Sequence, residues 1–384
     1  MIYFDHNAST PVRPEAAEAM RRALETLHGN PSSAHRDGQR ARAALERARE
    51  QVAALVGADP RAVVFTSGGT EGDHLALVGG AWAAPPDRRR VAISAIEHHA
   101  VHGAAELLER QGFAIEHLAV DRDGRVDPAA IDALPADTAV VSVMLANNET
   151  GVIEPIAEIA ARAAARGMRV HCDAVQAAGK VAVDAAGLGA DYLVISAHKL
   201  GGPKGVGALV VRAGAPLEPL QRGSAHEYGR RGGTENVSGI VGFGEAAAAA
   251  AREQAAEAAR LGALRERLEA GIRAAFPDAV IHAVAAPRLP NTVSVSIPGA
   301  RSDHMLMALD ARGVAVSAGA ACASGAVEPS PVMRAMGVPR ELAICALRLS
   351  LGRTTTLGEV DEVVRALVDS ARAVRGAAPA PAGS

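Results

Sequence analysis

The sequence contains few cysteines, and their spacing argues against two classes of protein. Only Cys172, Cys322 and Cys345 are present. An odd, small number argues against a disulfide framework, and no C-x-x-C pair is present to build a structural zinc site. Free thiols are typical of a reducing compartment. We therefore expect a cytoplasmic protein without a disulfide scaffold.

A strong charge of one sign is also missing. The 384 residues carry a formal net charge of -3, with 49% hydrophobic and 22% charged residues, which is an ordinary globular composition. A charge so close to neutral gives no indication of nucleic-acid or membrane binding. The first residues, MIYFDHNAST, show no basic segment followed by an apolar run, and no apolar stretch is long enough to cross a bilayer. We expect no secretion signal, no membrane partner and no nucleic-acid partner.

What the sequence does contain is a regular alternation of strand and helix patterns. Short apolar runs are separated by segments whose apolar residues recur at helical spacing. This alternation predicts an α/β fold with a mainly parallel sheet and helices on both faces. The expected strands are residues 62–66, 91–95, 114–118, 139–145, 168–172, 192–195 and 208–211. The expected helices are residues 15–27, 36–56, 100–110, 128–134, 156–166 and 244–276.

The alanine-rich helix expected at 244–276 divides the chain into two parts. The length is sufficient for two domains. We expect a large domain over residues 15–255 and a smaller α+β domain formed by residues 1–14 and 256–376. The final residues 377–384 are rich in alanine and proline, and we expect them to form a disordered tail.

The stretch 192–211, YLVISAHKLGGPKGVGALVV, places a lysine at the end of a buried strand. Desolvation lowers the pKa of an amine, and an amine that loses its proton easily can form a Schiff base with an aldehyde. Ser196 and His198, beside a glycine-rich turn, are groups that can hold a phosphate. Together these features favour Lys199 as a lysine that carries pyridoxal 5'-phosphate. The alternative is a surface lysine that follows an edge strand.

Polar residues gather at the ends of several expected strands. Ligands of α/β proteins bind at the carboxyl ends of parallel strands, so this convergence indicates a site. The SGGT turn that precedes a helix has the backbone geometry that binds anions. The clustered residues are 66–70, 97–99, 147–149, Asp173, Gln176 and 196–199.

Two further strand ends carry candidates for chemistry. Asp173 could pair with the protonated pyridine nitrogen of the cofactor, or it could cap the next helix. His98 could stack on a flat ring and move protons, or it could lie on a helix surface. His99 and His102 are three residues apart rather than four, so we expect no metal site.

The last third of the chain adds a thiol and a guanidinium. Cys322 lies among small residues in SAGAACASGAVEPS, which predicts a reactive cysteine on an uncrowded loop. Arg348 alternates with leucines in LRLSLGR, where a guanidinium usually binds an anion such as a substrate carboxylate. A structural salt bridge is the competing interpretation for Arg348, and Arg353 is the alternative carboxylate ligand.

Together these motifs resemble those of a known family. The chain is similar, nearly end to end, to the cysteine desulfurases of the NifS/IscS type within the class V aminotransferase fold. The motifs are YFDHNAST, NPSSAH, FTSGGTEGD, EHHAV, NNETG, HCDAVQ, SAHKLGGPKGVGAL, RRGGTEN, the Cys322 loop and RLSLGRTTT. The resemblance implies a pyridoxal-phosphate-dependent transferase of fold type I. His74 departs from the family, which often has asparagine there, and we expect it to alter only hydrogen bonding around the site.

The resemblance also implies a role for each motif residue. Lys199 would carry the cofactor, Asp173 would pair with the pyridine nitrogen, and Gln176 would pair with the phenolic oxygen. His98 would stack on the ring. The residues implied to hold the phosphate are Gly69, Thr70, Ser196, His198 and, from the neighbouring subunit of a homodimer, Thr234. The residues implied to bind the substrate are Asn7, Ala8, Asn148 and Arg348, and Asn148 would also contact the cofactor.

The activity implied by the resemblance is the removal of sulfur from L-cysteine. Lys199 would take the α proton, and the Cys322 thiolate would attack the substrate sulfur, leaving alanine and a persulfide. The persulfide would pass to a sulfur-acceptor protein such as an iron–sulfur cluster scaffold, with a cluster bridged near Cys322 as one arrangement. The long loop around Cys322 resembles the family members in which this loop moves. The alternatives are a selenocysteine lyase, an aminotransferase of the same fold, and a non-catalytic sulfur-carrier scaffold.

Overall fold

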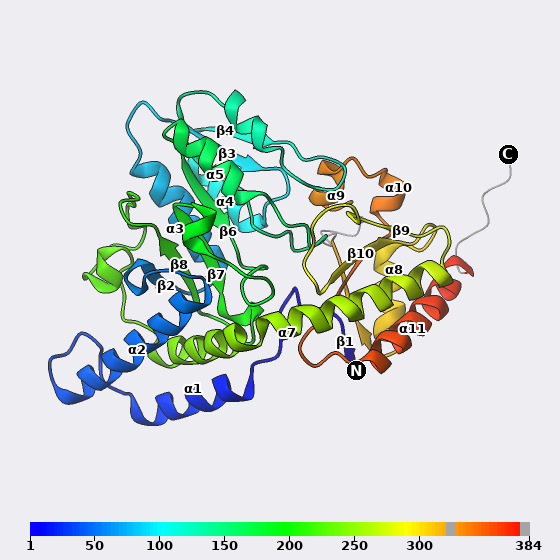
Figure 1. Ribbon diagram of the computed structural model, residues 1–384, viewed down its shortest axis with the longest axis horizontal. Helices are drawn as coiled ribbons and strands as arrows, with labels where there is room; N and C mark the ends of the chain where they lie inside the picture. The colour runs from blue at the N-terminus through cyan, green and yellow to red at the C-terminus, as the bar shows by residue number, and fades with distance from the viewer. Residues whose placement is uncertain (320–327, 377–384) are drawn as a thin grey trace.

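The computed structural model of the protein describes residues 1–319 and 328–376. Within these residues, two packed units are joined by one long helix (Figure 1). The larger unit contains a seven-stranded sheet, and the smaller unit contains a four-stranded sheet and a short two-stranded pair. The expected disordered tail and the loop around Cys322 lie outside the described residues.

The seven-stranded sheet confirms the predicted mainly parallel α/β fold. Its strand order is β2-β8-β7-β6-β5-β3-β4. The five strands from β7 to β4 are parallel to one another, and β8 runs antiparallel to both of its neighbours. The strands are β2 (Val63–Thr66), β3 (Arg90–Ser94), β4 (Ala114–Leu118), β5 (Thr138–Ser142), β6 (Arg169–Asp173), β7 (Tyr192–Ser196) and β8 (Gly207–Val211).

Alternate residues of the central strands enter two different hydrophobic cores. In β7, Leu193 and Ile195 pack with Phe243 on one face, whereas Tyr192 and Val194 pack on the other. Side chains alternate across a strand with a period of two, so an apolar residue is needed at every position when both faces are covered. This explains why β7 has the continuous apolar sequence YLVI.

Helices cover both faces of this sheet. Side chains of α2, α5 and the first half of α7 pack on one face, and side chains of α3 and α4 pack on the other. In Figure 1, α1 and α2 lie beside the first half of α7. The helices of this unit are α1 (Pro14–Thr26), α2 (Arg36–Leu55), α3 (Gly69–Trp82), α4 (His99–Arg110), α5 (Ile156–Ala165) and α6 (Ala185–Leu188).

The connecting helix α7 (Val237–Ala275) has 39 residues and contributes to both units. Phe243 belongs to the core beneath the large sheet, and Leu268 belongs to the core of the smaller unit. The helix begins seven residues before the expected start at 244. The side chain of Asn236 accepts a hydrogen bond from the Gly239 N–H at 3.1 Å and so caps the helix.

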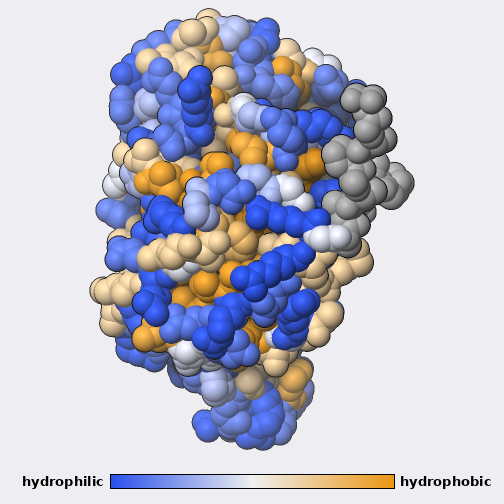
Figure 2. All heavy atoms as spheres, turned by 90° about the vertical axis from the view of Figure 1, so that its right-hand side faces the viewer, coloured by the Kyte–Doolittle hydropathy of each residue, from blue (hydrophilic) through white to orange (hydrophobic). Residues whose placement is uncertain are grey.

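The smaller unit is built on an antiparallel sheet in the order β12-β13-β10-β9. Its strands and those of the parallel pair are β1 (Ile2–Tyr3), β9 (Val280–Ile281), β10 (Thr292–Ser296), β11 (Val314–Ala315), β12 (Ser317–Ala318) and β13 (Ala346–Ser350). Its helices are α8 (Ser302–Asp310), α9 (Pro331–Ala335), α10 (Arg340–Ala343) and α11 (Leu357–Gly376). On this side of the molecule, hydrophilic side chains surround small apolar areas (Figure 2).

Two expected elements differ from the structure. Residues 128–134 form a 3-10 helix, η2 (Pro128–Ala133), rather than an α-helix, since Asp127 caps a segment of only six residues. Lys199 does not end strand β7 but lies one turn beyond it, in η3 (Ala197–Lys199). In the described part of the chain, no helix combines the length and apolar character needed to cross a membrane.

Candidate active site

A cavity of about 300 Å³ lies at the carboxyl ends of the central strands. Strands β6 and β7 end at Asp173 and Ser196, and helix α3 begins beside them at Gly69. The position agrees with the rule that α/β sheets bind ligands at this edge. Ten of the predicted site residues line the cavity: Ala8, Gly69, Thr70, His98, Asn148, Asp173, Gln176, Ser196, His198 and Lys199.

Lys199 presents its amine to this cavity. Its Nζ donates hydrogen bonds to the backbone oxygens of Asn7, at 2.5 Å, and Ala8, at 2.9 Å. Burial lowers the pKa of Lys199 to about 8, and the nearby Arg348 guanidinium acts in the same direction. A substantial neutral fraction near pH 8 is what Schiff-base formation requires. The interpretation of Lys199 as a simple surface lysine is therefore wrong.

The start of helix α3 forms a cradle for an anion. The helix begins at Gly69 with unpaired backbone N–H groups, which attract negative charge. A side chain at Gly69 would lie 3.1 Å from Val175 Cγ2, so glycine keeps the cradle open. Beside Gly69, the hydroxyl of Ser196 is buried and has no hydrogen-bond partner among the described residues. These groups fit the phosphate of pyridoxal phosphate.

Asp173 ends strand β6 and lines the cavity. Its Oδ1 accepts a hydrogen bond from the Val175 N–H at 2.8 Å, so the carboxylate caps the turn that follows, not the helix of the alternative interpretation, since the next helix begins at Ala185. Burial raises the pKa of Asp173. A protonated pyridine nitrogen would supply the positive charge that this buried carboxylate lacks, and the residues therefore fit the cofactor.

Two buried acids lie near Asp173: Glu97, which belongs to the predicted cluster 97–99, and Asp73, for which the sequence analysis predicted no role. Asp73 lines the cavity from α3, and its Oδ1 lies 3.3 Å from Nε2 of His171. Glu97 accepts hydrogen bonds from the Ser94 hydroxyl at 2.6 Å and the Met144 N–H at 2.8 Å. Burial, together with the neighbouring carboxylates, raises the pKa values of both groups. The sequence signal for Asp73 was its position inside the quoted FTSGGTEGD motif, whereas Glu97 stood both in the EHHAV motif and in the predicted cluster at a strand end.

His98 caps helix α4 and faces the cavity. Its Nδ1 accepts a hydrogen bond from the Ala100 N–H at 3.2 Å, so the neutral ring carries its proton on Nε2. Burial lowers the pKa of His98 to about 4, with Lys199 acting in the same direction. His98 is exposed at the start of α4, as the helix-surface alternative expected, and it also lines the cavity. His98 does stand four residues before His102, but the described residues contain no cluster of three potential metal ligands.

Arg348 approaches the site behind Asn148. Its Nη2 donates to Asp5 Oδ1 at 2.7 Å and its Nη1 donates to the Asn148 backbone oxygen at 3.1 Å, while its Nε has no partner among the described residues. The structural salt bridge is therefore present, and the Nε–H and the second N–H of each Nη remain for a ligand. Arg353 is exposed and lines a different cavity. Neither Arg348 nor Asn7 lines the main cavity directly, although the Asn7 carbonyl contacts Lys199.

Thr234 is a further predicted residue that does not line this cavity. Cys322 lies outside the described residues. Thr234 is exposed and lines a separate cavity of about 150 Å³ near Arg231. Its loop is held by a buried ion pair in which Arg49 Nη1 lies 2.7 Å from Glu227 Oε2. A cofactor contact from Thr234 within its own subunit is therefore not observed.

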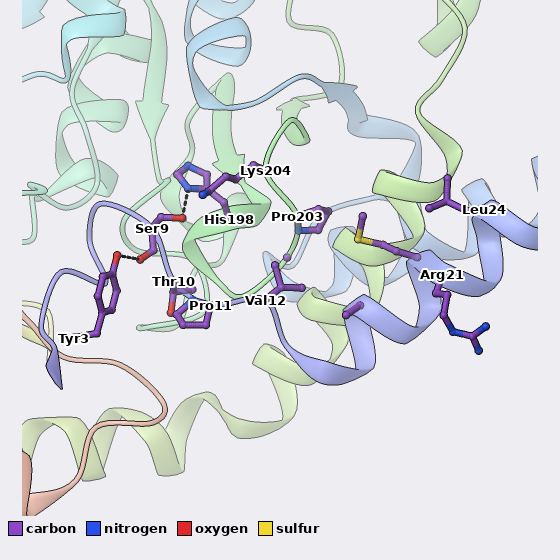
Figure 3. Close-up of a pocket in the computed structure, with 13 residues that line it drawn as sticks. Tyr3, Ser9, Thr10, Pro11, Val12, Arg21, Leu24, His198, Pro203 and Lys204 are labelled. Carbon is purple, nitrogen blue, oxygen red and sulfur yellow. Dashed lines mark hydrogen bonds between the residues drawn. The ribbon is translucent and has the colours of Figure 1, made fainter. Parts of the chain in front are cut away.

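A wider groove adjoins the site on the side of the N-terminal arm. It has a volume of about 810 Å³, and His198 lines both the groove and the main cavity. In Figure 3, Ser9 of the arm points toward His198, whose Nδ1 lies 3.3 Å from the Ser9 hydroxyl. The apolar side chains of Val12 and Leu24 are exposed along it.

A mainly parallel sheet with an amine-bearing lysine, an anion cradle and a buried carboxylate at one edge defines a pyridoxal-phosphate enzyme of fold type I. The family described as Aminotransferase class-V matches residues 2–363. A "Cysteine desulfurase IscS" from Anaeromyxobacter sp. (strain Fw109-5) is 46% identical over 98% of this chain and 94% of its own length.

Two solved structures agree with this classification. A "NIFS-LIKE PROTEIN" superimposes with a TM-score of 0.89 at 36% identity, covering 96% of this chain and 98% of the other. A structure titled "SspA in complex with cysteine" gives a TM-score of 0.80 at 30% identity, covering 91% and 99%. The chain therefore belongs to the class-V aminotransferase family and, within it, to the pyridoxal-phosphate-dependent cysteine desulfurases of the NifS/IscS type.

The buried acid Glu97 leads to a prediction for the pH dependence of stability. Burial raises the pKa of Glu97 to about 8, so its ionisation costs stability progressively as the pH rises from the unfolded value toward 8. The amide of a Glu97→Gln variant would keep one oxygen for Ser94 and Met144 but would not ionise. Between pH 5 and pH 8.5, we expect the free energy of unfolding to fall by about 3 kcal/mol less in the variant than in the parent.

Chemical denaturation of both cofactor-loaded proteins at the two pH values measures this difference. Glu109→Gln, a change of the same type at an exposed position on α4, is the control and should follow the parent. Identical pH slopes for the parent and the Glu97→Gln variant would contradict the prediction.

Proposed function

We propose that this enzyme releases sulfur from L-cysteine with Lys199 as the base and Cys322 as the sulfur nucleophile. The observation that carries the proposal is that the Lys199 amine and the Asp173 carboxylate line one cavity. Pyridoxal phosphate, when bound there, stabilises negative charge at the substrate α carbon. The family comparisons support desulfurase activity over an aminotransferase or a selenocysteine lyase.

The proposed roles follow from the surroundings of each residue. With a pKa of about 8, the Lys199 amine can accept and return a proton near neutral pH. His98 carries its ring proton on Nε2 and can face the cofactor ring. The Cys322 thiolate attacks the substrate sulfur, a sulfur–sulfur bond forms, and the carbon–sulfur bond breaks. The electron pair of that bond stays with the carbon, which takes up a proton returned by Lys199, and the carbon skeleton leaves as alanine.

The direct test is a balance of products. Incubation of the cofactor-loaded enzyme with L-cysteine should yield alanine and, before any acceptor is added, one persulfide on Cys322 per active site. Mass spectrometry of the protein identifies the modified cysteine. Absence of alanine would contradict the proposal, and a persulfide on Cys172 or Cys345 would contradict the assignment of Cys322.

Arg348 is proposed to bind the substrate carboxylate. A guanidinium binds a carboxylate through paired N–H groups, and a lysine ammonium cannot reproduce that geometry. We expect Arg348→Lys to raise KM for L-cysteine by about 10- to 100-fold, because a hydrogen bond to a charged group contributes about 1.5–3 kcal/mol. Steady-state kinetics of alanine formation measures the change.

Arg353→Lys is the matched control for this prediction. Arg353 is exposed, and the same substitution there should leave KM unchanged. An unchanged KM in Arg348→Lys, or a larger effect in Arg353→Lys, would assign the carboxylate to Arg353 instead.

We further propose that the active unit is a homodimer in which Thr234 serves the partner's phosphate site. Three features support this: Thr234 is exposed, its loop is fixed by the Arg49–Glu227 ion pair, and an open groove lies beside the phosphate end of the cavity. Glu227 and Tyr228 adopt positive φ angles of 48° and 60°, which persist only when the surroundings hold them. Light scattering should give the mass of two chains, and a monomer with full activity would contradict the proposal.

The sulfur acceptor of this enzyme is also a proposal. The relatives named IscS support an iron–sulfur scaffold as the sulfur acceptor. Co-purification followed by transfer of labelled sulfur from L-cysteine would identify the acceptor.

The division into a domain of residues 15–255 and a domain of residues 1–14 and 256–376 is proposed as the division into folding units. The cytoplasmic location stays a prediction.

A further inference from the structure

Lysine is rare in this chain, and one of its lysines has no role in the activity described above. Of the 40 lysine and arginine residues, only Lys180, Lys199 and Lys204 are lysines. Lys204 is exposed, and Lys199 is the amine of the active site. Lys180 is partly accessible along its side chain, but its amino group is buried. A buried cation requires compensating contacts.

The amino group of Lys180 has two such contacts, and both lead to the active site. Its Nζ donates to Gln176 Oε1 at 2.7 Å and to Asn7 Oδ1 at 3.1 Å. Gln176 lines the main cavity, and the backbone oxygen of Asn7 accepts the hydrogen bond of Lys199. Burial lowers the pKa of Lys180 well below its usual value, and the charge of Lys199 acts in the same direction. Either protonation state retains N–H donors for these two oxygens.

These contacts determine which way the Gln176 amide faces. Its oxygen is occupied by Lys180, and its Nε2 donates to the Asn7 backbone oxygen at 2.9 Å. A flipped amide would place N–H groups against the Lys180 amine and an oxygen against the Asn7 carbonyl, which are two repulsive contacts. Gln176 donates one of its two amide N–H groups in these bonds, and the other has no partner in them. Gln176 itself lines the cavity.

We propose that Lys180 is a positioning residue, which fixes Gln176 as a hydrogen-bond donor to the phenolic oxygen of the cofactor next to Lys199. This inference rests on the proposed function, because it assumes that Gln176 contacts that oxygen. A donor to this oxygen withdraws negative charge from it, and the oxygen then shares the proton of the neighbouring imine nitrogen less strongly. Loss of the donor should therefore raise the pH at which the cofactor's visible absorbance changes.

The test is a double-mutant cycle on that absorbance midpoint in the cofactor-loaded enzyme. We expect Lys180→Met and Gln176→Leu each to raise the midpoint by about one pH unit. If Lys180 acts through Gln176, the double variant should match Gln176→Leu alone, because the two changes remove one interaction. The other titratable groups around the Lys199 amine are unchanged in every variant, and they include His98, Asp173, His198, Arg348 and Asp5.

Two outcomes of this double-mutant cycle would overturn the inference. Additive shifts of the midpoint in the double variant would show that Lys180 acts through its own charge. An unchanged midpoint in Lys180→Met would show that Lys180 has no role in positioning Gln176. Lys204→Met, the same substitution at the exposed lysine, should keep the parental midpoint. A parent protein with no visible cofactor band would instead overturn the proposed function.

If Lys180→Met does not retain the cofactor, the conservative variant Lys180→Arg provides the test instead. It keeps a cationic N–H donor for the Gln176 oxygen and should retain a midpoint close to the parent's. A midpoint in Lys180→Arg as high as that of Gln176→Leu would overturn the inference, because a donor at position 180 would then have no effect.

Discussion

The Lys199→Ala variant is expected to lose the visible absorbance of bound pyridoxal phosphate and to form alanine from L-cysteine at least about 10³-fold more slowly. Both effects have one cause, since the same amine forms the bond to the cofactor and accepts the substrate proton. The structure supports this through the position of Nζ in the cavity and its pKa of about 8. Absorbance spectra after dialysis with the cofactor and a coupled assay for alanine measure the two effects.

The Lys204→Ala variant is the matched control, because Lys204 is five residues away and exposed. It should keep both the absorbance and the rate. A Lys199→Ala variant with an unchanged visible band would remove Lys199 from its role, and Lys180 would then be the next amine to test.

The Cys322→Ala variant is expected to keep the cofactor band but to lose sulfide and persulfide formation by about 10³-fold or more. The reason is that only a thiolate can take the sulfur from the substrate, while cofactor binding depends on groups of the large unit. Absorbance spectra confirm that the cofactor is bound, and release of sulfide from L-cysteine in the presence of a reductant measures the loss.

Cys345→Ala is the control for this prediction. The Cys345 thiol is buried, and burial raises its pKa, so it is a poor nucleophile at neutral pH. Its removal should leave sulfide release unchanged. Normal sulfide release from Cys322→Ala would identify another nucleophile and would contradict the proposed function.

The arrangement of strands and the residues at their ends were well predicted from the sequence. Strand β7 and the turn after it were recognised because a continuous apolar run followed by glycines has a strong local signature. The boundaries were less well predicted. The start of α7 depends on the Asn236 cap, which resembles any polar loop residue, and Lys199 lies one turn beyond the strand.

The roles of Asp73, Glu97 and Lys180 could not be predicted from local pattern. Each faces a partner that is distant in sequence: Asp73 lies against His171, Glu97 against Met144, and Lys180 against Asn7. A side chain's partner across the sheet depends on strand order and on which face is covered. Neither is encoded in the periodicity of a single segment.

The sequence alone determined the kinds of chemistry that this protein possesses: an amine after a buried strand, acids and amides at neighbouring strand ends, and a cysteine among small residues. These follow from composition and from short-range periodicity, because burial of a strand is visible in consecutive residues. Only the tertiary structure decided how these groups are joined. The Asn7 carbonyl holds Lys199, Lys180 turns the Gln176 amide, and Asp5 pairs with Arg348. Such contacts arise when packing brings distant segments together, since a buried polar group must find its partner wherever the fold places one.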